Sequence, residues 1–223
     1  MGKLSIVATP IGNLGDITLR ALETLKKCDV IYAEDTRVIS KLLARYEIKK
    51  PLQRLDAATE SKKANEIIAR LEKSEHVAFV SDAGTPGISD PGSRLVAKVR
   101  EQLPEIKIEA IPGVSALTTA LSIAGIEMDG FTFLGFLPHK KGRQTALKKM
   151  ATSEFPIVLY ESPHRILKLL KEVETLDATR VILARELTKI HEEIISGTPR
   201  EILEHFAAHP EKVRGEFVVI ISF

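Results

Sequence analysis

The sequence has no tryptophan and a single cysteine, Cys28, among its 223 residues. One thiol cannot form an intramolecular disulfide, and without further cysteines a thiolate zinc site is excluded. Cys28 lies among Leu25, Val30 and Ile31, so we expect a buried, unreactive thiol and a reducing compartment, the cytoplasm. The absence of tryptophan also removes one of the aromatic platforms that many single-strand-binding proteins use.

Long apolar runs are missing as well. The apolar stretch near the N-terminus, residues 4–8, is too short for a signal sequence and lacks a small-residue cleavage pattern. No other run approaches the length of a membrane span, so we expect no membrane segment. The net charge of +2 gives only weak support for a nucleic-acid partner.

Two phosphate-binding motifs are absent. The sequence contains no GxxxxGK[ST] motif, and the first predicted loop has no GxGxxG motif. A nucleoside triphosphate or dinucleotide ligand therefore has little support. No group of metal-ligating residues stands out either, so we predict no metal site.

Short apolar runs alternate with segments of helical periodicity along the whole chain. This alternation predicts parallel βαβ units and an α/β fold. A turn-rich stretch at 125–130 separates two such halves, and we place the division between about 112 and 130, giving domains 1–113 and 114–223. Strands are expected at 4–8, 29–33, 76–81, 106–111, 131–136, 156–160, 179–184 and 216–222, with helices near 18–28, 91–103, 114–124, 140–151, 163–174 and 199–208, and two more around the spaced apolar residues of 39–46 and 64–71.

Two of these helices have clear start signals. Ser162 and Thr198 each precede a proline, which places an N-cap before a proline at the first helical position. Glu201 follows Thr198 by three residues and completes a capping box.

The loops that follow the strands carry most of the polar and glycine-rich sequence. In open α/β sheets, ligands bind beyond the carboxyl ends of the strands. The loop SDAGTPGISDPG (81–92) contains Gly84, Gly87 and Gly92, which permit close approach of the backbone to a ligand. Asp90 and the following proline are also a good helix start, but that role leaves Asp82 and the GTPG run unexplained. We therefore expect a ligand-binding loop here.

The loop motifs together resemble one protein family. ATPIGNLGDITLRAL, YAEDTR, SDAGTPGISDPG, IPGVSA, FLGFLP, ESPHR and ARELTK occur in this order, and over residues 3–222 they resemble the ribosomal small-subunit methyltransferase I family, a branch of the tetrapyrrole methylases. The resemblance implies two unlike α/β domains with S-adenosylmethionine in the cleft between them, and a homodimer. It also implies methyl transfer to the ribose 2′-oxygen of a cytidine at the decoding centre of 16S ribosomal RNA. Corrin and porphyrin methylases usually begin with a GxGxGD loop, and ATPIGN in its place favours the ribosomal branch.

The resemblance also supplies cofactor contacts. It implies that Ile11, after the first strand, lies beside the cofactor, and that Asp82, Gly84 and Thr85 of the 81–92 loop line its methionine end. It also implies that Ser115 and Ala116 contact the cofactor from the start of their helix. Tyr160 and Ala184 of the second domain are implied to border the adenosine.

The catalytic base is left open. A ribose hydroxyl is a poor nucleophile at neutral pH, so a positioned base, or a charge that stabilises the developing alkoxide, should assist. The candidates are Glu34, Asp35, Glu161 and Lys189. Asp35, or the threonine after it, is equally explained as a helix N-cap. Arg185 and Glu186 are equally explained as a pair, with Lys189 reaching RNA.

A basic stretch at 139–149 contains five cationic residues and no acid: Lys140, Lys141, Arg143, Lys148 and Lys149. It is either an ordinary solvated helix face or a surface that binds RNA phosphates. Arg37 and Arg165 are further possible RNA contacts, and Lys49, Lys50 and Arg54 form a weaker basic group. Two other functions remain open at this point, a tetrapyrrole methyltransferase and a non-catalytic RNA-binding module.

Overall fold

The computed structural model describes residues 2–56 and 58–223, and the chain divides into two compact units, Met1–Ser115 and Ala116–Phe223. Each unit builds one five-stranded sheet with its own hydrophobic core. The α/β fold class predicted from the sequence is confirmed.

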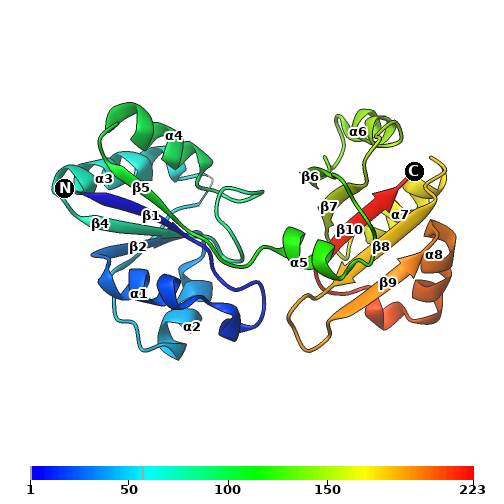
Figure 1. Cartoon of the computed structure of the whole chain (residues 1–223), viewed down its shortest axis with the longest axis horizontal. Coiled ribbons are helices and arrows are strands. Elements are labelled where there is room, and N and C mark those ends of the chain that lie inside the picture. Colours follow the sequence, from blue (N-terminus) through cyan, green and yellow to red (C-terminus); the bar gives the residue numbers. More distant parts are fainter. Residues whose placement is uncertain (1, 57) are drawn as a thin grey trace. The chain divides into compact units, whose positions relative to one another are not determined.

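The first unit is a parallel sheet in the order β3-β2-β4-β1-β5 (Figure 1). Helices α3 and α4 cover one face of this sheet, and α1 and α2 cover the other, so β2 and most of β4 are buried on both faces. Because the strands are parallel, their carboxyl ends all lie at one edge. The elements are β1 (Lys3–Val7), η1 (Leu14–Asp16), α1 (Leu19–Lys27), β2 (Val30–Ala33), α2 (Thr36–Arg45), β3 (Leu52–Arg54), α3 (Glu60–Glu72), β4 (His76–Val80), α4 (Ser93–Gln102) and β5 (Lys107–Ile111).

The second unit is a mixed sheet in the order β6-β7-β10-β8-β9. Only β6 and β7 are parallel; β10 lies antiparallel between β7 and β8, and β8 and β9 form an antiparallel hairpin. The elements are α5 (Ala116–Ile123), β6 (Thr132–Phe136), α6 (Arg143–Met150), β7 (Ile157–Glu161), α7 (Ile166–Glu174), β8 (Arg180–Arg185), β9 (Glu193–Gly197), α8 (Pro199–Ala208), η2 (Pro210–Lys212) and β10 (Phe217–Ser222).

The prediction that the second half repeats the parallel scheme of the first is therefore wrong. Residues 186–192 join β8 directly to β9, and a parallel neighbour would need a long crossover, usually a helix. Strands β3 and β9 were not expected either, because both mix polar with apolar residues and are only partly buried.

The helix-start predictions have different outcomes. Thr198 and Glu201 form the predicted capping box of α8. Ser162 does not cap α7: the carbonyl of Ser162 accepts the N–H groups of Arg165 and Ile166 at 3.0 and 3.1 Å, so residues 162–165 form a turn and the helix begins at Ile166. This turn brings the Arg165 guanidinium to Glu161, at 3.1 Å.

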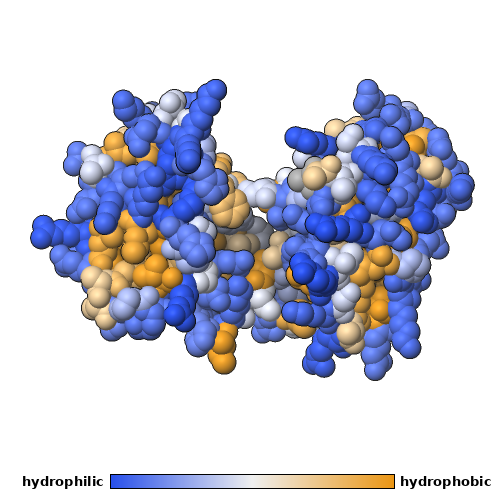
Figure 2. Space-filling view, turned by 180° about the vertical axis from the view of Figure 1, so that it is seen from behind, coloured by the Kyte–Doolittle hydropathy of each residue, from blue (hydrophilic) through white to orange (hydrophobic). Residues whose placement is uncertain are grey.

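Hydrophilic residues cover most of the face shown in Figure 2, with separate apolar patches on each unit. Within the described residues, no helix is both long and apolar enough to cross a membrane. Cys28 is buried as predicted, and this burial raises the pKa of its thiol to about 11.

Candidate functional site

Two loops are joined at the carboxyl edge of the first sheet. The N–H of Thr9 donates to the carbonyl of Gly84 at 2.9 Å, and the N–H of Gly84 donates back at 3.0 Å. The Thr9 hydroxyl donates to the Ser81 carbonyl at 3.1 Å, and the Ser81 hydroxyl donates to the Gly84 carbonyl at 3.0 Å. These bonds fix the start of the 81–92 loop against the loop after β1.

Gly84 occupies a position that favours glycine. Its φ is +80°, and a Cβ there would lie 3.3 Å from Cγ2 of Ile11 and 3.5 Å from the carbonyl oxygen of Val114. The hydroxyl of Thr85 donates to the same Val114 carbonyl at 3.3 Å. The structure thus brings Ile11, Gly84 and Thr85 together, at the segment that leads to Ser115.

Carboxylates gather at the same edge of the sheet. Oδ1 of Asp82 accepts the backbone N–H of Asp35 at 2.8 Å, which links the loops after β4 and β2. Partial burial raises the pKa of Glu34, and the charges of Asp82 and Asp56 raise it further. Burial likewise raises the pKa of Asp90 to about 6, with contributions from Glu34 and Asp82.

The place of Asp90 in this group of carboxylates was not predicted, because its position before a proline indicated a helix start. Helix α4 begins at Ser93 with Gly92 at the N-cap position, so Asp90 lies before the helix, near other acids. The only signal in the sequence was that two aspartates occur in one glycine-rich loop.

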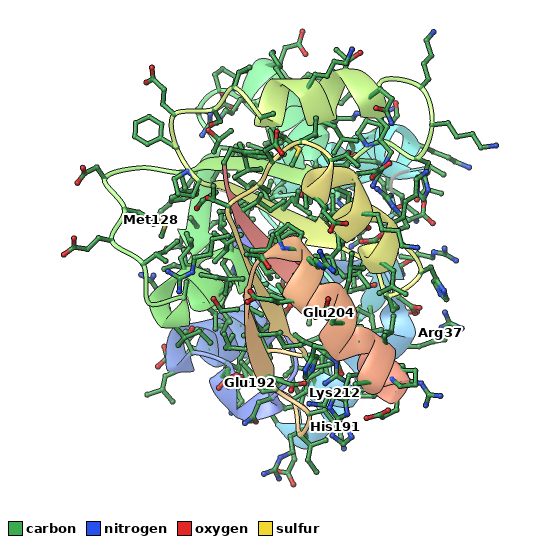
Figure 3. The ribbon with its side chains drawn as sticks, turned by 90° about the vertical axis from the view of Figure 1, so that its right-hand side faces the viewer. Arg37, Met128, His191, Glu192, Glu204 and Lys212 are labelled. Atoms are coloured by element: carbon green, nitrogen blue, oxygen red, sulfur yellow. The ribbon has the colours of Figure 1, made fainter. Side chains whose placement is uncertain are left out.

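Asp35 is the N-cap of α2. Its Oδ1 accepts the backbone N–H of Arg37 at 2.9 Å, and the Arg37 guanidinium pairs with the same carboxylate. The hydrogen bonds from Arg37 lower the pKa of Asp35 to about 2. The exposed Arg37 (Figure 3) is therefore neutralised locally, and Asp35 is a poor proton acceptor.

In the second unit, Tyr160 of β7 and Ala184 of β8 lie on either side of Val218 in β10. The Tyr160 ring contacts Phe133 and Phe136, and its centroid lies 5.1 Å from that of Phe133 and 5.6 Å from that of Phe136. Phe136 is 55% exposed. The structure brings these two candidate residues together beside an aromatic cluster, which the sequence signalled only through the FLGFLP motif. Ala116, another candidate, begins α5.

Glu161, Arg143 and Arg165 form a buried ionic network. Arg143 is 3% exposed; its guanidinium binds Glu172 at 2.6 Å and lies 4.0 Å from Glu161. Arg143 and Arg165 also donate to the carbonyls of Pro138 and Leu137, at 3.3 and 2.6 Å. The assignment of Arg143 to RNA contacts is therefore wrong, because its charge is buried and paired. The mostly buried Arg165 holds the same loop, and the fully buried Glu161 side chain pairs with Arg165, which favours a structural role for both.

Lys189 is held by two carboxylates, Glu186 at 2.9 Å and Glu216 at 2.8 Å. Its partial burial would lower its pKa, but the hydrogen bonds to Glu216 and Glu186 outweigh that effect and raise it. Lys189 therefore stays protonated and cannot act as a general base. Arg185 pairs with Glu193, not with Glu186.

Lys189 lies in the loop 186–192 of the β8–β9 hairpin, which carries His191 and Glu192 at its tip (Figure 3). Glu192 accepts the backbone N–H of Thr188, and Lys212 pairs with Glu193 at the base of β9. These bonds fix the loop that carries Lys189.

The remaining lysines of the basic stretch are exposed. Lys140 and Lys141 precede α6, and Lys148 and Lys149 lie on it. In the described part of the chain, no acidic side chain forms an ion pair with any of these four. They can therefore contact an external anion, which Arg143 cannot.

A sequence profile of the tetrapyrrole (corrin/porphyrin) methylases matches residues 3–203. The chain is 44% identical over 223 residues to ribosomal RNA small subunit methyltransferase I of Thermotoga maritima, covering 100% of this chain and 99% of that protein. It is 47% identical to the proteins of the same name from Borrelia garinii subsp. bavariensis and Pasteurella multocida, covering 98% and 99% of this chain and 98% and 79% of those proteins.

Solved structures show the same fold at low identity. Diphthine synthase superposes with a TM-score of 0.76 at 14% identity, covering 99% of this chain and 90% of that one. Cobalt precorrin-4 methyltransferase gives 0.73 at 18%, covering 98% and 94%. Uroporphyrin-III C-methyl transferase from Thermus thermophilus, complexed with S-adenyl homocysteine, gives 0.67 at 17%, covering 99% and 97%. On the family profile and the full-length relatives, the chain belongs to the ribosomal RNA small subunit methyltransferase I family of the tetrapyrrole methylases.

Proposed function

We propose that this protein transfers a methyl group from S-adenosylmethionine to the ribose 2′-oxygen of a cytidine in 16S ribosomal RNA, at the decoding centre of the small subunit. The observation that carries the proposal is the identity of 44–47%, over almost the whole chain, to ribosomal RNA small subunit methyltransferases. Among the tetrapyrrole methylase folds, the structure solved with S-adenyl homocysteine supports the cofactor. We further propose a cytoplasmic homodimer.

The residues at the edge of the first sheet fit this cofactor. The charge of Asp82 raises the pKa of Glu34, and the charges of Glu34 and Asp82 raise the pKa of Asp90, so a cation bound near these carboxylates would relieve their repulsion. S-adenosylmethionine carries a sulfonium and an ammonium group. The backbone at Gly84, beside Ile11, has no side chain to block a close approach. When bound, the cofactor supplies the electrophilic methyl group, and the protein has to align the hydroxyl with it.

The cofactor contacts that the resemblance implies are proposed for each unit by itself. The first unit provides Ile11, Asp82, Gly84, Thr85 and Ser115. The second unit provides Ala116, Tyr160 and Ala184, and the place of Tyr160 and Ala184 on one face of the sheet supports a shared role.

Among the four candidate bases, Glu34 is the one whose properties suit proton transfer. Its raised pKa brings it closer to neutral pH, where a general base is most effective. The pKa of Asp35 is too low, Lys189 is protonated, and Glu161 is buried in ion pairs. We therefore propose that Glu34 accepts the proton of the ribose hydroxyl.

The test is methylation of assembled small ribosomal subunits that lack the modification, followed by nucleoside analysis. We expect a 2′-O-methylcytidine that appears only with S-adenosylmethionine and active protein. Glu34→Gln should lower kcat by about 10²–10⁴-fold and leave cofactor affinity intact. Methylation of a porphyrin or corrin precursor instead of RNA would refute the proposal, and cofactor binding would argue strongly against a non-catalytic RNA-binding module.

A further inference from the structure

The far end of the 81–92 loop is held by Glu60, the first residue of α3. Although charged, Glu60 is only 4% exposed. Its Oε1 accepts the backbone N–H of Gly92 at 3.1 Å and that of Leu95 at 3.0 Å. Gly92 is the N-cap position of α4, and Leu95 is the third residue of the helix. Glu60 therefore provides, from another helix, the acceptor that an N-cap side chain normally provides.

Helix α4 cannot supply this cap itself. Gly92 has a φ of +124°, and a Cβ there would lie 2.6 Å from Cε1 of the fully buried Phe79. Serine, threonine and aspartate, the usual N-cap residues, are thus excluded at this position. The positive end of the helix dipole and two N–H donors compensate for the burial of the Glu60 carboxylate.

The loop is consequently anchored at both ends. Thr9 holds Gly84, and Glu60 holds Gly92, while the N–H of Gly87 donates to the Pro91 carbonyl at 3.0 Å between them. Helices α3 and α4, which carry the second anchor, lie side by side on one face of the sheet (Figure 1).

We propose that Glu60 is a positioning residue of the cofactor site, which holds loop 81–92 in the conformation that binds S-adenosylmethionine. This inference rests on the proposed function, because that function places the cofactor at Asp82, Gly84 and Thr85. Without Glu60, the N–H groups of Gly92 and Leu95 lose their acceptor. The loop then has to be ordered when the cofactor binds, and the apparent affinity falls in proportion to the fraction of ordered loop.

The experiment measures the Kd for S-adenosylmethionine by calorimetry, together with kcat and KM, for Glu60→Ala and Glu60→Gln. We expect Glu60→Ala to raise the Kd and the cofactor KM about tenfold, with kcat at saturating cofactor nearly unchanged. Glu60→Gln keeps an amide oxygen that accepts both N–H groups, so it should restore the affinity.

Glu201→Ala is the matched control, because it removes a carboxylate that caps a helix of the second unit, where Oε2 of Glu201 accepts the N–H of Thr198 at 2.7 Å. It should lower the melting temperature and leave the cofactor Kd unchanged. A parent-like Kd in Glu60→Ala, or an equal rise in Glu201→Ala, would overturn the proposal.

A second measurement covers the case in which Glu60→Ala does not fold. Hydrogen exchange of the parent protein without cofactor should show protected amides at Gly92 and Leu95. Free exchange there would also overturn the proposal. A parent protein that binds no S-adenosylmethionine would refute the proposed cofactor instead, so the two failures are distinguishable.

Discussion

Replacing Lys140 and Lys141 with alanine tests the proposed RNA surface most directly. Both lysines are exposed and unpaired with acids in the described residues, whereas Arg143, three residues after Lys140, is buried against Glu172. Each phosphate contact contributes about 0.7 to the slope of log K against log salt for single-stranded RNA and about 0.9 for a duplex. If each lysine contacts one phosphate, the loss of one lysine makes the slope shallower by that amount. The double variant should therefore lose about 1.4–1.8 from the slope.

This change in slope has a measurable consequence. Between 50 and 200 mM salt, the affinity of the parent for RNA should fall about tenfold more than the affinity of the double variant. Fluorescence anisotropy with a labelled fragment of the small-subunit RNA gives both curves. S-adenosylmethionine affinity should not change.

Lys26→Ala/Lys27→Ala is the matched control, because these exposed lysines of α1 carry the same total charge. If the control reduces the salt slope of RNA binding as much as Lys140→Ala/Lys141→Ala does, the effect comes from the net charge of the protein and not from local phosphate contacts. An unchanged slope in the test variant would refute the assignment and leave this stretch as a solvated helix face.

Four further predictions follow from the structure. Gly84→Val should weaken cofactor binding at least tenfold by calorimetry, because it adds a branched side chain at positive φ beside Ile11; parent-like affinity would contradict the proposed site. Arg143→Ala should destabilise the fold by about 3–5 kcal/mol in denaturant unfolding, because it removes the closest partner of the mostly buried Glu172 and leaves only Lys168 at 3.9 Å, and a loss below 1 kcal/mol would count against the network. The raised pKa of Asp90 means that the folded state holds more protons between about pH 4 and 6, so stability falls as pH rises; Asp90→Asn should raise the melting temperature more at pH 7.5 than at pH 4, and an equal gain would refute this. Light scattering should give a dimer at micromolar concentration, and a monomer there would remove that proposal.

The first sheet was predictable from the sequence because its signals are local. The strands from β1 to β5, apart from β3, are short apolar runs between amphipathic helices, and the loops after them lie at one edge for topological reasons. The capping box at Thr198 and Glu201 is equally local, and the structure contains it as predicted.

Apart from the local turn at 162–165, the main errors involve partners that are distant in sequence. The periodicity of 139–149 could not show that Arg143 is the one cationic residue of this stretch that points inward, because its partner Glu172 lies on α7. Nothing around Glu60 indicates that it accepts N–H groups from α4, more than thirty residues later. The mixed order of the second sheet depends on β10 pairing between two strands that precede it in the chain.

This strand order has a consequence for synthesis on the ribosome. Strands β7 and β8 are both complete before β10 exists, but neither pairs with the other in the native sheet. Until residues 217–222 emerge, the nascent second unit has only two separate pairs, β6 with β7 and β8 with β9, and an isolated pair of strands is marginally stable in water. The first unit needs no residue beyond Ser115 for its sheet and can fold earlier. The two units therefore reach their native state at different times during translation. The second unit has incomplete strand pairing until its last strand is made, and it needs protection from aggregation for longer.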